Sequence, residues 1–257
     1  MATDGYNPTG SMAVDAQGNF YGATRNGGTT NNGTIFKIDP AGNETVLYNF
    51  LGQADGSLPL GLVWGPDGAL YGATSCTYTC YSGGGTLFKV DTAGNLTTLY
   101  SFAGTTDGNV PNGYLQFDAA GNIYGTTFFG GLNGCGYYTF GCGTVFKLAP
   151  DGTETVVYEF QGSTDGTYPS GGVIADTKGN LYGVTLNGGD LNINAPPGCG
   201  VVYKLNTRGK ETVLHTFESS DGCQPEGELL LSKKVLYGAA NAGGTTAYGA
   251  IFKIDLK

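Results

Sequence analysis

Residues 107–127 read DGNVPNGYLQFDAAGNIYGTT, and residues 144–148 continue as TVFKL after an irregular loop. Three landmarks of this stretch recur in the same order along the chain: an Asp-Gly pair, a Tyr-Gly pair and an aromatic-Lys pair. The Asp-Gly pairs begin at Asp4, Asp55, Asp107, Asp165 and Asp221. The other two landmarks begin at Tyr21, Tyr71, Tyr124, Tyr182 and Tyr237, and at Phe36, Phe88, Phe146, Tyr203 and Phe252. Such internal repetition, with a period of about fifty residues, indicates a repeat architecture.

Each of the first four repeats predicts four short strands separated by turn sequences. In the third repeat the expected strands are Tyr114–Phe117, Ile123–Thr127, Thr144–Leu148 and Thr155–Phe160. Four consecutive antiparallel strands form one blade of a β-propeller. The sequence therefore predicts an all-β fold, a five-bladed β-propeller. A β-helix is the main alternative, but its coils are usually shorter and need no pair of hairpin turns in each unit.

The repeats predict a single domain over residues 1–257 whose last blade is incomplete. The expected repeat boundaries are 1–54, 55–106, 107–164, 165–220 and 221–257. The fifth repeat ends with its third strand, at residues 251–255, so its last strand is missing. Either one blade has three strands, or a strand preceding Asp4 closes the ring. An unpaired strand edge left there would favour association with another chain.

Composition and charge exclude several classes of protein. The chain has 257 residues, 47 of them glycine, with 21 acidic and 12 basic residues, and the net charge of -9 repels polyanions. We therefore expect no nucleic-acid partner. No apolar run reaches the length of a membrane helix, so this domain should not insert into a membrane. Residues 1–5 lack the features of a signal peptide, and we expect an exported domain whose signal and anchor lie outside this sequence.

The six cysteines favour disulfides over a metal site. None has the paired CxxC or Cys/His spacing of a zinc site, and no cofactor or metal is expected. The simplest pairing joins cysteines of the same loop or of neighbouring repeats: Cys76 with Cys80, Cys135 with Cys142, and Cys199 with Cys223. Six cysteines allow fifteen pairings, so the sequence does not fix this one. Disulfides of this kind fit a secreted or cell-surface protein.

The repeat motif resembles a known family. The strings DG-x-x-P-x-G, D-x-x-G-N-[LI]-Y-G and G-T-[VIL]-F-K, for example in residues 176–183, resemble the GloVer (Gloeo-Verruco) tandem repeat over essentially the whole chain. The resemblance implies an exported or surface-attached bacterial protein, and it carries no catalytic motif. Residues 231–234, LSKK, depart from the family's Asp/Gly/Asn turn, so that hairpin is the least certain.

Residues that recur in every repeat are best explained by the building of blades. The repeated tyrosines could form a ring of ligand contacts, but packing between blades with a satisfied hydroxyl fits their spacing better. The aspartates of the Asp-Gly pairs could be acids or calcium ligands. Short polar side chains before glycine usually bond nearby backbone amides, so we interpret them as supports of their loops.

Candidate ligand-binding residues lie in the loops that break the repeat. The loops between the second and third strands emerge on one face of the predicted disc, together with the connections between blades. That face is the expected binding face, and its ligand is expected to be a glycan or a surface protein. Its candidate contacts are Tyr78, Tyr81, Phe128, Phe129, Tyr137, Tyr138 and Phe140. The alternative is that these rings fold back as small cores for their own loops.

Catalysis has little support in the sequence. His215, the only histidine, stands where other repeats have tyrosine, which favours a packing role over a general base. The leading hypothesis is therefore a secreted or surface-displayed, non-catalytic module that binds glycan or protein. A glycan-active hydrolase or lyase would need off-repeat carboxylates, for which Glu226, Glu228 and Asp190 are the candidates. A structural surface spacer is the third hypothesis, and the oligomeric state is not predicted.

Overall fold

The computed structural model describes residues 4–52, 54–76, 84–131, 140–190 and 198–257, and its regular structure in these ranges is entirely β. The first sheet contains β1 (Tyr6–Val14), β2 (Phe20–Asn26), β3 (Thr34–Ile38) and β4 (Glu44–Asn49). The second contains β5 (Ser57–Trp64), β6 (Leu70–Cys76), β7 (Thr86–Val90) and β8 (Leu96–Ser101). The third contains β9 (Asn109–Pro111), β10 (Gln116–Phe117), β11 (Ile123–Phe129), β12 (Thr144–Leu148) and β13 (Glu154–Glu159).

The remaining two sheets follow in chain order. The fourth contains β14 (Thr167–Pro169), β15 (Ile174–Ala175), β16 (Leu181–Asn187), β17 (Val201–Leu205) and β18 (Glu211–Thr216). The fifth contains only β19 (Cys223–Ser232), β20 (Val235–Ala242) and β21 (Ala250–Asp255). The prediction that the fifth repeat lacks its last strand is thus confirmed for the described residues.

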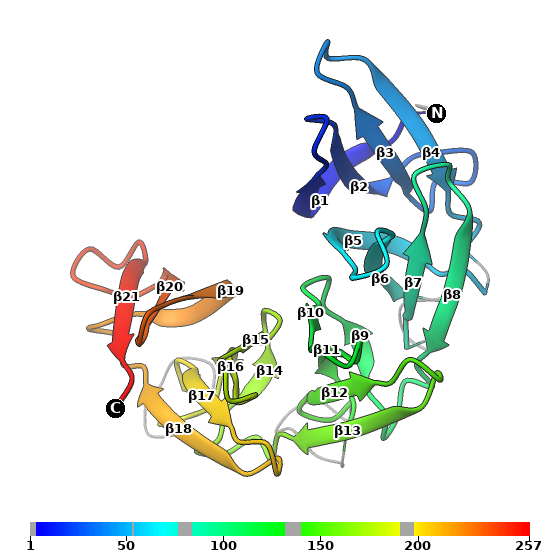
Figure 1. The fold of residues 1–257 in the computed structure, drawn as a ribbon. Coiled ribbons are helices and arrows are strands. Elements are labelled where there is room, and N and C mark those ends of the chain that lie inside the picture. Colours follow the sequence, from blue (N-terminus) through cyan, green and yellow to red (C-terminus); the bar gives the residue numbers. More distant parts are fainter. Residues whose placement is uncertain (1–3, 53, 77–83, 132–139, 191–197) are drawn as a thin grey trace.

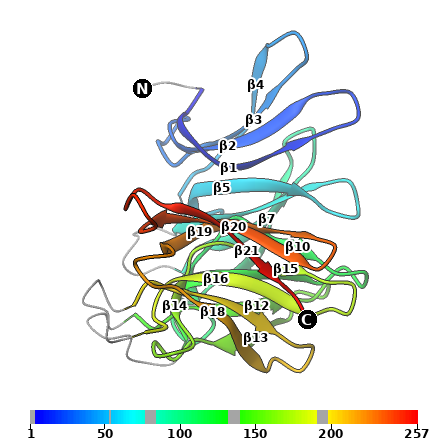
Figure 2. The same cartoon turned by 90° about the vertical axis from the view of Figure 1, so that its left-hand side faces the viewer.

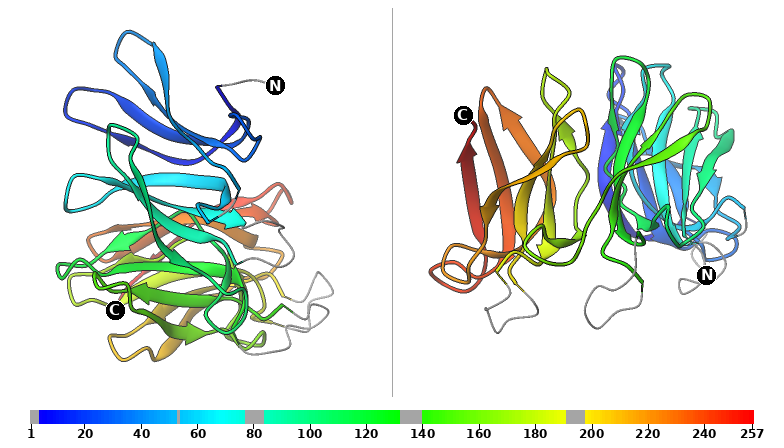
Figure 3. Two further views of the ribbon diagram at one scale, coloured as in Figure 1. Left: turned by 90° about the vertical axis from the view of Figure 1, so that its right-hand side faces the viewer. Right: turned by 90° about the horizontal axis from the view of Figure 1, so that it is seen from below.

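The five sheets stand side by side in an open arc, with the first strand of each sheet toward the centre (Figure 1). Contacts run from each sheet to the next, for example from β1 to β5, β6 to β9, β11 to β14 and β16 to β19. Views from the side and from below show the sheets stacked face to face along this arc (Figures 2 and 3). The first and last sheets do not meet, so the described residues do not form the closed ring that the sequence predicts.

One interface type holds neighbouring sheets together four times. A phenylalanine after the last strand of one sheet packs edge-on against an aromatic ring of the third strand of the next. These pairs are Phe50 with Phe88, Phe102 with Phe146, Phe160 with Tyr203 and Phe217 with Phe252. Their ring centres lie 4.9–5.3 Å apart, in the range of favourable aromatic pairs. Because both faces of a middle sheet are covered, its apolar residues need not alternate with polar ones.

Candidate active site

The repeated tyrosines and aspartates are structural in every described repeat that has the complete motif. The hydroxyl of Tyr182 donates a 3.0 Å hydrogen bond to Oδ2 of Asp176, and the Lys204 amine lies 5.7 Å from the ring centre of Tyr182. Burial, with the hydrogen bond and charge of Asp176, raises the pKa of Tyr182 to about 12. This phenol is therefore a neutral donor at physiological pH, as the packing interpretation predicts.

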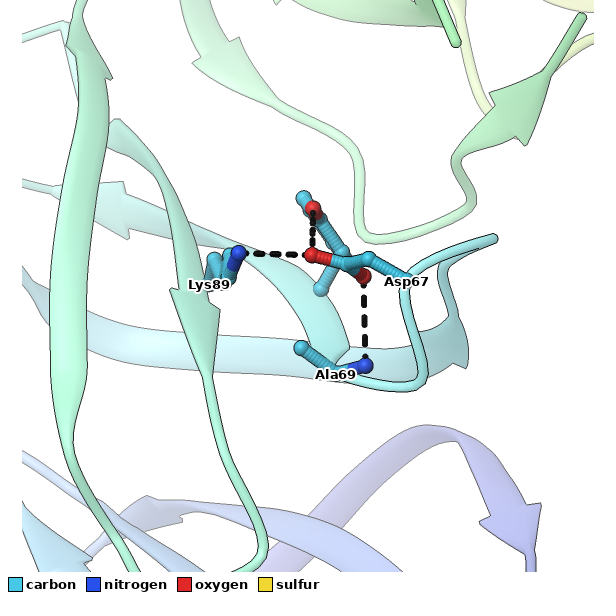
Figure 4. Close-up of polar contacts among 4 residues, drawn as sticks. Asp67, Ala69 and Lys89 are labelled. Atoms are coloured by element: carbon cyan, nitrogen blue, oxygen red, sulfur yellow. Dashed lines mark hydrogen bonds and ion pairs between the residues drawn. The ribbon is translucent and has the colours of Figure 1, made fainter.

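The second repeat shows the same cluster with a different turn. Oδ2 of Asp67 accepts hydrogen bonds from the Lys89 amine at 2.6 Å and the Tyr71 hydroxyl at 3.1 Å (Figure 4). The backbone N–H of Ala69 donates to Oδ1 at 3.2 Å. The lysine of the aromatic-Lys pair therefore binds the turn aspartate and stabilises the hairpin, and we do not interpret it as part of a ligand site.

The aspartates of the Asp-Gly pairs support their loops, as expected. Oδ2 of Asp107 accepts a 3.0 Å hydrogen bond from the Tyr100 hydroxyl and a 2.7 Å bond from the backbone N–H of Ala103. Asp55 and Asp165 are bonded in the same way. His215 replaces the tyrosine in the fourth sheet, where its Nε2 lies 2.9 Å from Oδ2 of Asp221. His215 therefore occupies the tyrosine position, as the packing interpretation predicts, while the choice between packing and catalysis stays a prediction.

The structure describes three of the seven loop aromatics that the sequence suggests as ligand contacts. Phe128 stacks on Tyr168 at 5.1 Å, and Phe129 packs edge-on against both rings, while Phe140 lies 5.9 Å from Phe129 and is exposed. Three of the seven predicted contacts are therefore near one another and beside the next sheet. The other four, Tyr78, Tyr81, Tyr137 and Tyr138, lie outside the described residues. Ligand binding at this face stays a prediction.

The disulfide between Cys199 and Cys223 is present and ties the fourth sheet to the fifth, as predicted. Cys142 is also disulfide-bonded. Cys80 and Cys135 lie outside the described residues, as does the side chain of Cys76, so the other two pairings stay predictions. Within the described part of the chain, no group of three or more His, Cys, Asp or Glu side chains could hold a metal ion. The same residues contain no helix long and apolar enough to cross a membrane.

A pocket of about 340 Å³ lies where the innermost strands converge. Its walls come from β1, β5, the β9–β10 segment and β19, and therefore from four of the five sheets. They are formed by Ser11, Met12, Ala13, Val14, Leu62, Val63, Trp64, Tyr114, Leu115 and Glu228. We call this cavity the axial pocket. A mostly apolar cavity with a few convergent polar groups at the centre of the fold is the usual form of a small-molecule site.

Glu228 supplies the carboxyl group among the lining residues of the axial pocket. Partial desolvation at the pocket wall raises the pKa of this carboxyl above the ordinary glutamate value, although the side chain as a whole is exposed. Two of the other polar lining groups are already engaged, because the Ser11 hydroxyl donates to the carbonyl of Leu62 and the Trp64 Nε1–H donates to the carbonyl of Val14. Glu228 is therefore the group in this pocket best suited to proton transfer.

The three off-repeat acids are not equivalent. Glu226, two residues earlier on β19, is exposed like Glu228, and Asp190 is half-buried just beyond β16. Glu228 lines the axial pocket, whereas Glu226 and Asp190 do not. Sequence analysis thus selected Glu228 but missed the walls around it. The signal it could have used is Trp64, the one tryptophan of the chain.

A larger cavity of about 550 Å³ lies between the third and fourth sheets, beside the turns that contain Asp118 and Arg208. A similar groove lies between the second and third sheets, beside Asp67 and Lys89. Because the groove recurs between neighbouring repeats and is lined by turn residues, we attribute it to the stacking of sheets. The axial pocket, which no pair of repeats forms alone, is the better candidate site.

The chain belongs to the Gloeobacter/Verrucomicrobia repeat family, whose model matches residues 1–139 and 105–257. No curated protein matches its sequence. Solved structures with a similar fold include a gluconolactonase from Xanthomonas campestris, with a TM-score of 0.59 and 16% identity over 99% of this chain and 78% of that one. A protein assigned as a gluconolactonase has a TM-score of 0.56 and 17% identity over 99% and 79%. A luciferin-regenerating enzyme has a TM-score of 0.55 and 12% identity over 100% and 92%.

These neighbours correct the functional hypothesis drawn from the sequence. That hypothesis, a non-catalytic module that binds glycan or protein, is wrong, because the similar folds belong to proteins named as enzymes. The spacer alternative is set aside with it, while the names of these enzymes do not test the glycan-active alternative. Sequence reasoning erred because it subtracted the repeat and looked only at the loops. In a fold of radial sheets, a site can form from the inner strands of the repeats themselves.

Proposed function

We propose that the five sheets are blades of a β-propeller and that the protein hydrolyses a small polar ester or lactone in the axial pocket. The observation that carries the proposal is the position of Glu228 in a cavity walled by the inner strands of four sheets. The names of the gluconolactonases with a similar fold suggest the substrate class. The Cys199–Cys223 disulfide favours an exported location, since structural disulfides persist in oxidising compartments.

In this proposal Glu228 acts as a general base. Its carboxylate accepts a proton from a water molecule while the water oxygen attacks the carbonyl carbon of the substrate. The tetrahedral intermediate then expels the alkoxide oxygen, which takes the proton from Glu228 and leaves as the alcohol. A carboxyl whose pKa is raised is a stronger base once ionised, and partial desolvation raises the pKa of Glu228, which supports this role.

Tyr114 is the proposed hydrogen-bond donor to the substrate carbonyl oxygen. Its side chain is half-buried and lines the axial pocket, and the described residues record no hydrogen bond of its hydroxyl. A donor aimed at the developing oxyanion lowers the barrier to attack. The apolar walls, including Met12 and Trp64, would hold the carbon skeleton of the substrate.

The test is a pH-stat assay with aldonolactones, γ-butyrolactone and p-nitrophenyl acetate as probes. We expect Glu228→Gln to lower kcat by about 10²–10⁴-fold, the usual contribution of a general base. Glu226→Gln, on the same strand but outside the pocket, is the matched control and should keep full activity. Equal rates for the wild type and Glu228→Gln on every probe hydrolysed would refute the role of Glu228. No hydrolysis above the buffer rate on any probe would refute the substrate class.

A further inference from the structure

The first sheet has one apolar face that no residue in the described part of the chain covers. Met12, Val14 and Phe20, on β1 and β2, form this leading face and are 56%, 47% and 41% exposed. The equivalent residues of the second sheet, such as Leu62 and Leu70, are at most 1% exposed because the first sheet packs on them. The strand registers fix this equivalence, since Val14 pairs with Phe20 as Trp64 pairs with Leu70. The leading face is therefore one half of an inter-sheet interface.

The last sheet presents the other half. Leu230, Tyr237 and Ile251 form its trailing face and are 64%, 38% and 88% exposed. The residues at the position of Ile251 in the earlier sheets are fully buried against the following sheet: Ile35, Leu87, Val145 and Val202. The trailing face thus has the side chains of an interface that is completed four times elsewhere in the chain. Exposed apolar area of this kind marks an interaction surface.

The last sheet also has an unpaired edge. In each of the first four sheets the third strand pairs on both sides, as β17 pairs with β16 and β18. β21 pairs only with β20 among the described residues. Its outer backbone N–H and C=O groups are therefore open to a further strand, and an open edge of this type recruits one readily.

We propose that these features together seat one more unit of the same repeat, inserted between the last and first sheets. Its first strand would pair with β21, and its own sheet would pack one face on the trailing face and the other on the leading face. The arc supports a single unit, because the five sheets already occupy most of the circle and the opening lies between β21 and β1 (Figure 1). A second whole copy of the chain does not fit this opening. If it continued the same curvature, its later sheets would collide with the first sheet.

The interface chemistry defines this occupant. Each completed interface needs a phenylalanine after the last strand of one sheet and an aromatic ring on the third strand of the next. Phe36 is the third-strand ring of the first sheet and has no such partner from a preceding sheet among the described residues. The occupant should therefore end in a strand followed by phenylalanine, as residues 154–160 do.

The proposal can be tested by appending residues 94–160 directly after Lys257. Lys257 stands at the repeat position of Ala93, so this fusion keeps the turn register and adds an outer strand, a complete sheet and a terminal Phe160. We expect residues 1–257 to bind the dye ANS at their exposed apolar faces, and the fusion to lose most of this binding. We also expect it to unfold at a higher urea concentration in one cooperative transition.

Ile251→Asp is the matched control. In residues 1–257 it should change the urea midpoint little, because Ile251 is exposed. In the fusion Ile251→Asp should abolish the increase in the urea midpoint, because it places a charge inside the new interface. Unchanged ANS binding and urea midpoint in the fusion would overturn the proposal. It would also be overturned if sedimentation shows residues 1–257 to be a dimer that Ile251→Asp dissociates, or a monomer that binds no ANS.

Discussion

The hydroxyl of Tyr158, on the last strand of the third sheet, donates a 3.0 Å hydrogen bond to Oδ2 of Asp165, which opens the fourth repeat. The same oxygen accepts a 2.7 Å bond from the backbone N–H of Gln161. Asp165 is buried, so these bonds fix the connection between two sheets where little water competes for them. The Asp-Gly landmark therefore sets how one sheet is joined to the next.

Replacing Asp165 should cost stability rather than activity. Asp165→Ala leaves the Tyr158 hydroxyl and the Gln161 amide without their acceptor, and we expect a loss of about 2–4 kcal/mol in the free energy of unfolding. Urea denaturation followed by tryptophan fluorescence measures it. Glu44→Gln, at an exposed position, is the control and should stay within about 0.5 kcal/mol of wild type. If Asp165→Ala lowered the free energy of unfolding by less than about 0.5 kcal/mol, Asp165 would not support the connection between the sheets.

His215 offers a test of packing against catalysis. It occupies the position of Tyr158 in the next sheet, packs edge-on against Phe217 at 4.7 Å, and meets Asp221 as the tyrosines meet their aspartates. His215→Tyr should therefore keep both stability and hydrolysis. His215→Phe should lower the free energy of unfolding by about 1 kcal/mol through the lost hydrogen bond. If His215→Tyr abolished hydrolysis while the protein stayed folded, the histidine would have a chemical role.

The sequence predicts the strands of this fold better than their closure. Residues 144–148 form a strand with the predicted bounds, because turn residues delimit them on both sides. The first strand of the third repeat was predicted as residues 114–117, whereas the structure divides it into β9 and β10. The backbone N–H of Asn112 bonds to Thr126 and its side-chain amide to Pro169 of the next sheet, and these tertiary bonds leave no sequence pattern.

The candidate site was only partly predictable, for a similar reason. Glu228 departs from the repeat and is visible in the sequence as an off-pattern acid. Its neighbours in the axial pocket, such as Met12 and Leu115, occupy ordinary repeat positions in sheets far apart along the chain. Only the arc of sheets brings them together. The exposure of the leading and trailing faces is hidden likewise, since Ile251 has the same sequence context as the buried Val145.

Two half-buried glutamates should make stability depend on pH. Burial, with the charge of Asp107 or Asp165, raises the pKa of Glu154 and of Glu211 to about 7. The folded state therefore binds protons more tightly than the unfolded state, whose glutamates have ordinary pKa values near 4.5. Their contribution to stability is complete below that value and is lost as the pH rises to about 7. Urea midpoints should accordingly fall from pH 5 to pH 7.

Glu154→Gln and Glu211→Gln should weaken this dependence. At pH 8 each should raise the free energy of unfolding by about 1 kcal/mol, a modest gain because solvent screens these half-buried groups. The exposed Glu44, at the same strand position in the first sheet, is the matched control, and Glu44→Gln should leave the pH profile unchanged. A pH profile that stayed as steep in the double variant would contradict the assignment.

Val110 tests a strained position that every repeat shares. It precedes the proline of its repeat and has a φ of 58°, in the left-handed region that β-branched residues avoid. Asn7, Leu58, Tyr168 and Gln224 occupy the equivalent positions with φ of 56–59°. The conformation aims the backbone N–H of Val110 at the carbonyl of Gly84 in the preceding sheet, 3.0 Å away. The link between sheets therefore maintains the strain.

Val110→Asn should relieve this strain while keeping the link, because asparagine tolerates the left-handed region and already serves at Asn7. We expect the free energy of unfolding to rise by about 0.5–1 kcal/mol, measured by urea denaturation. Val110→Thr is the control, since it stays β-branched and should bring no gain. A loss of stability in Val110→Asn would mean that packing of the half-buried valine outweighs its backbone strain. Equal gains in both variants would show that backbone conformation is not the cause.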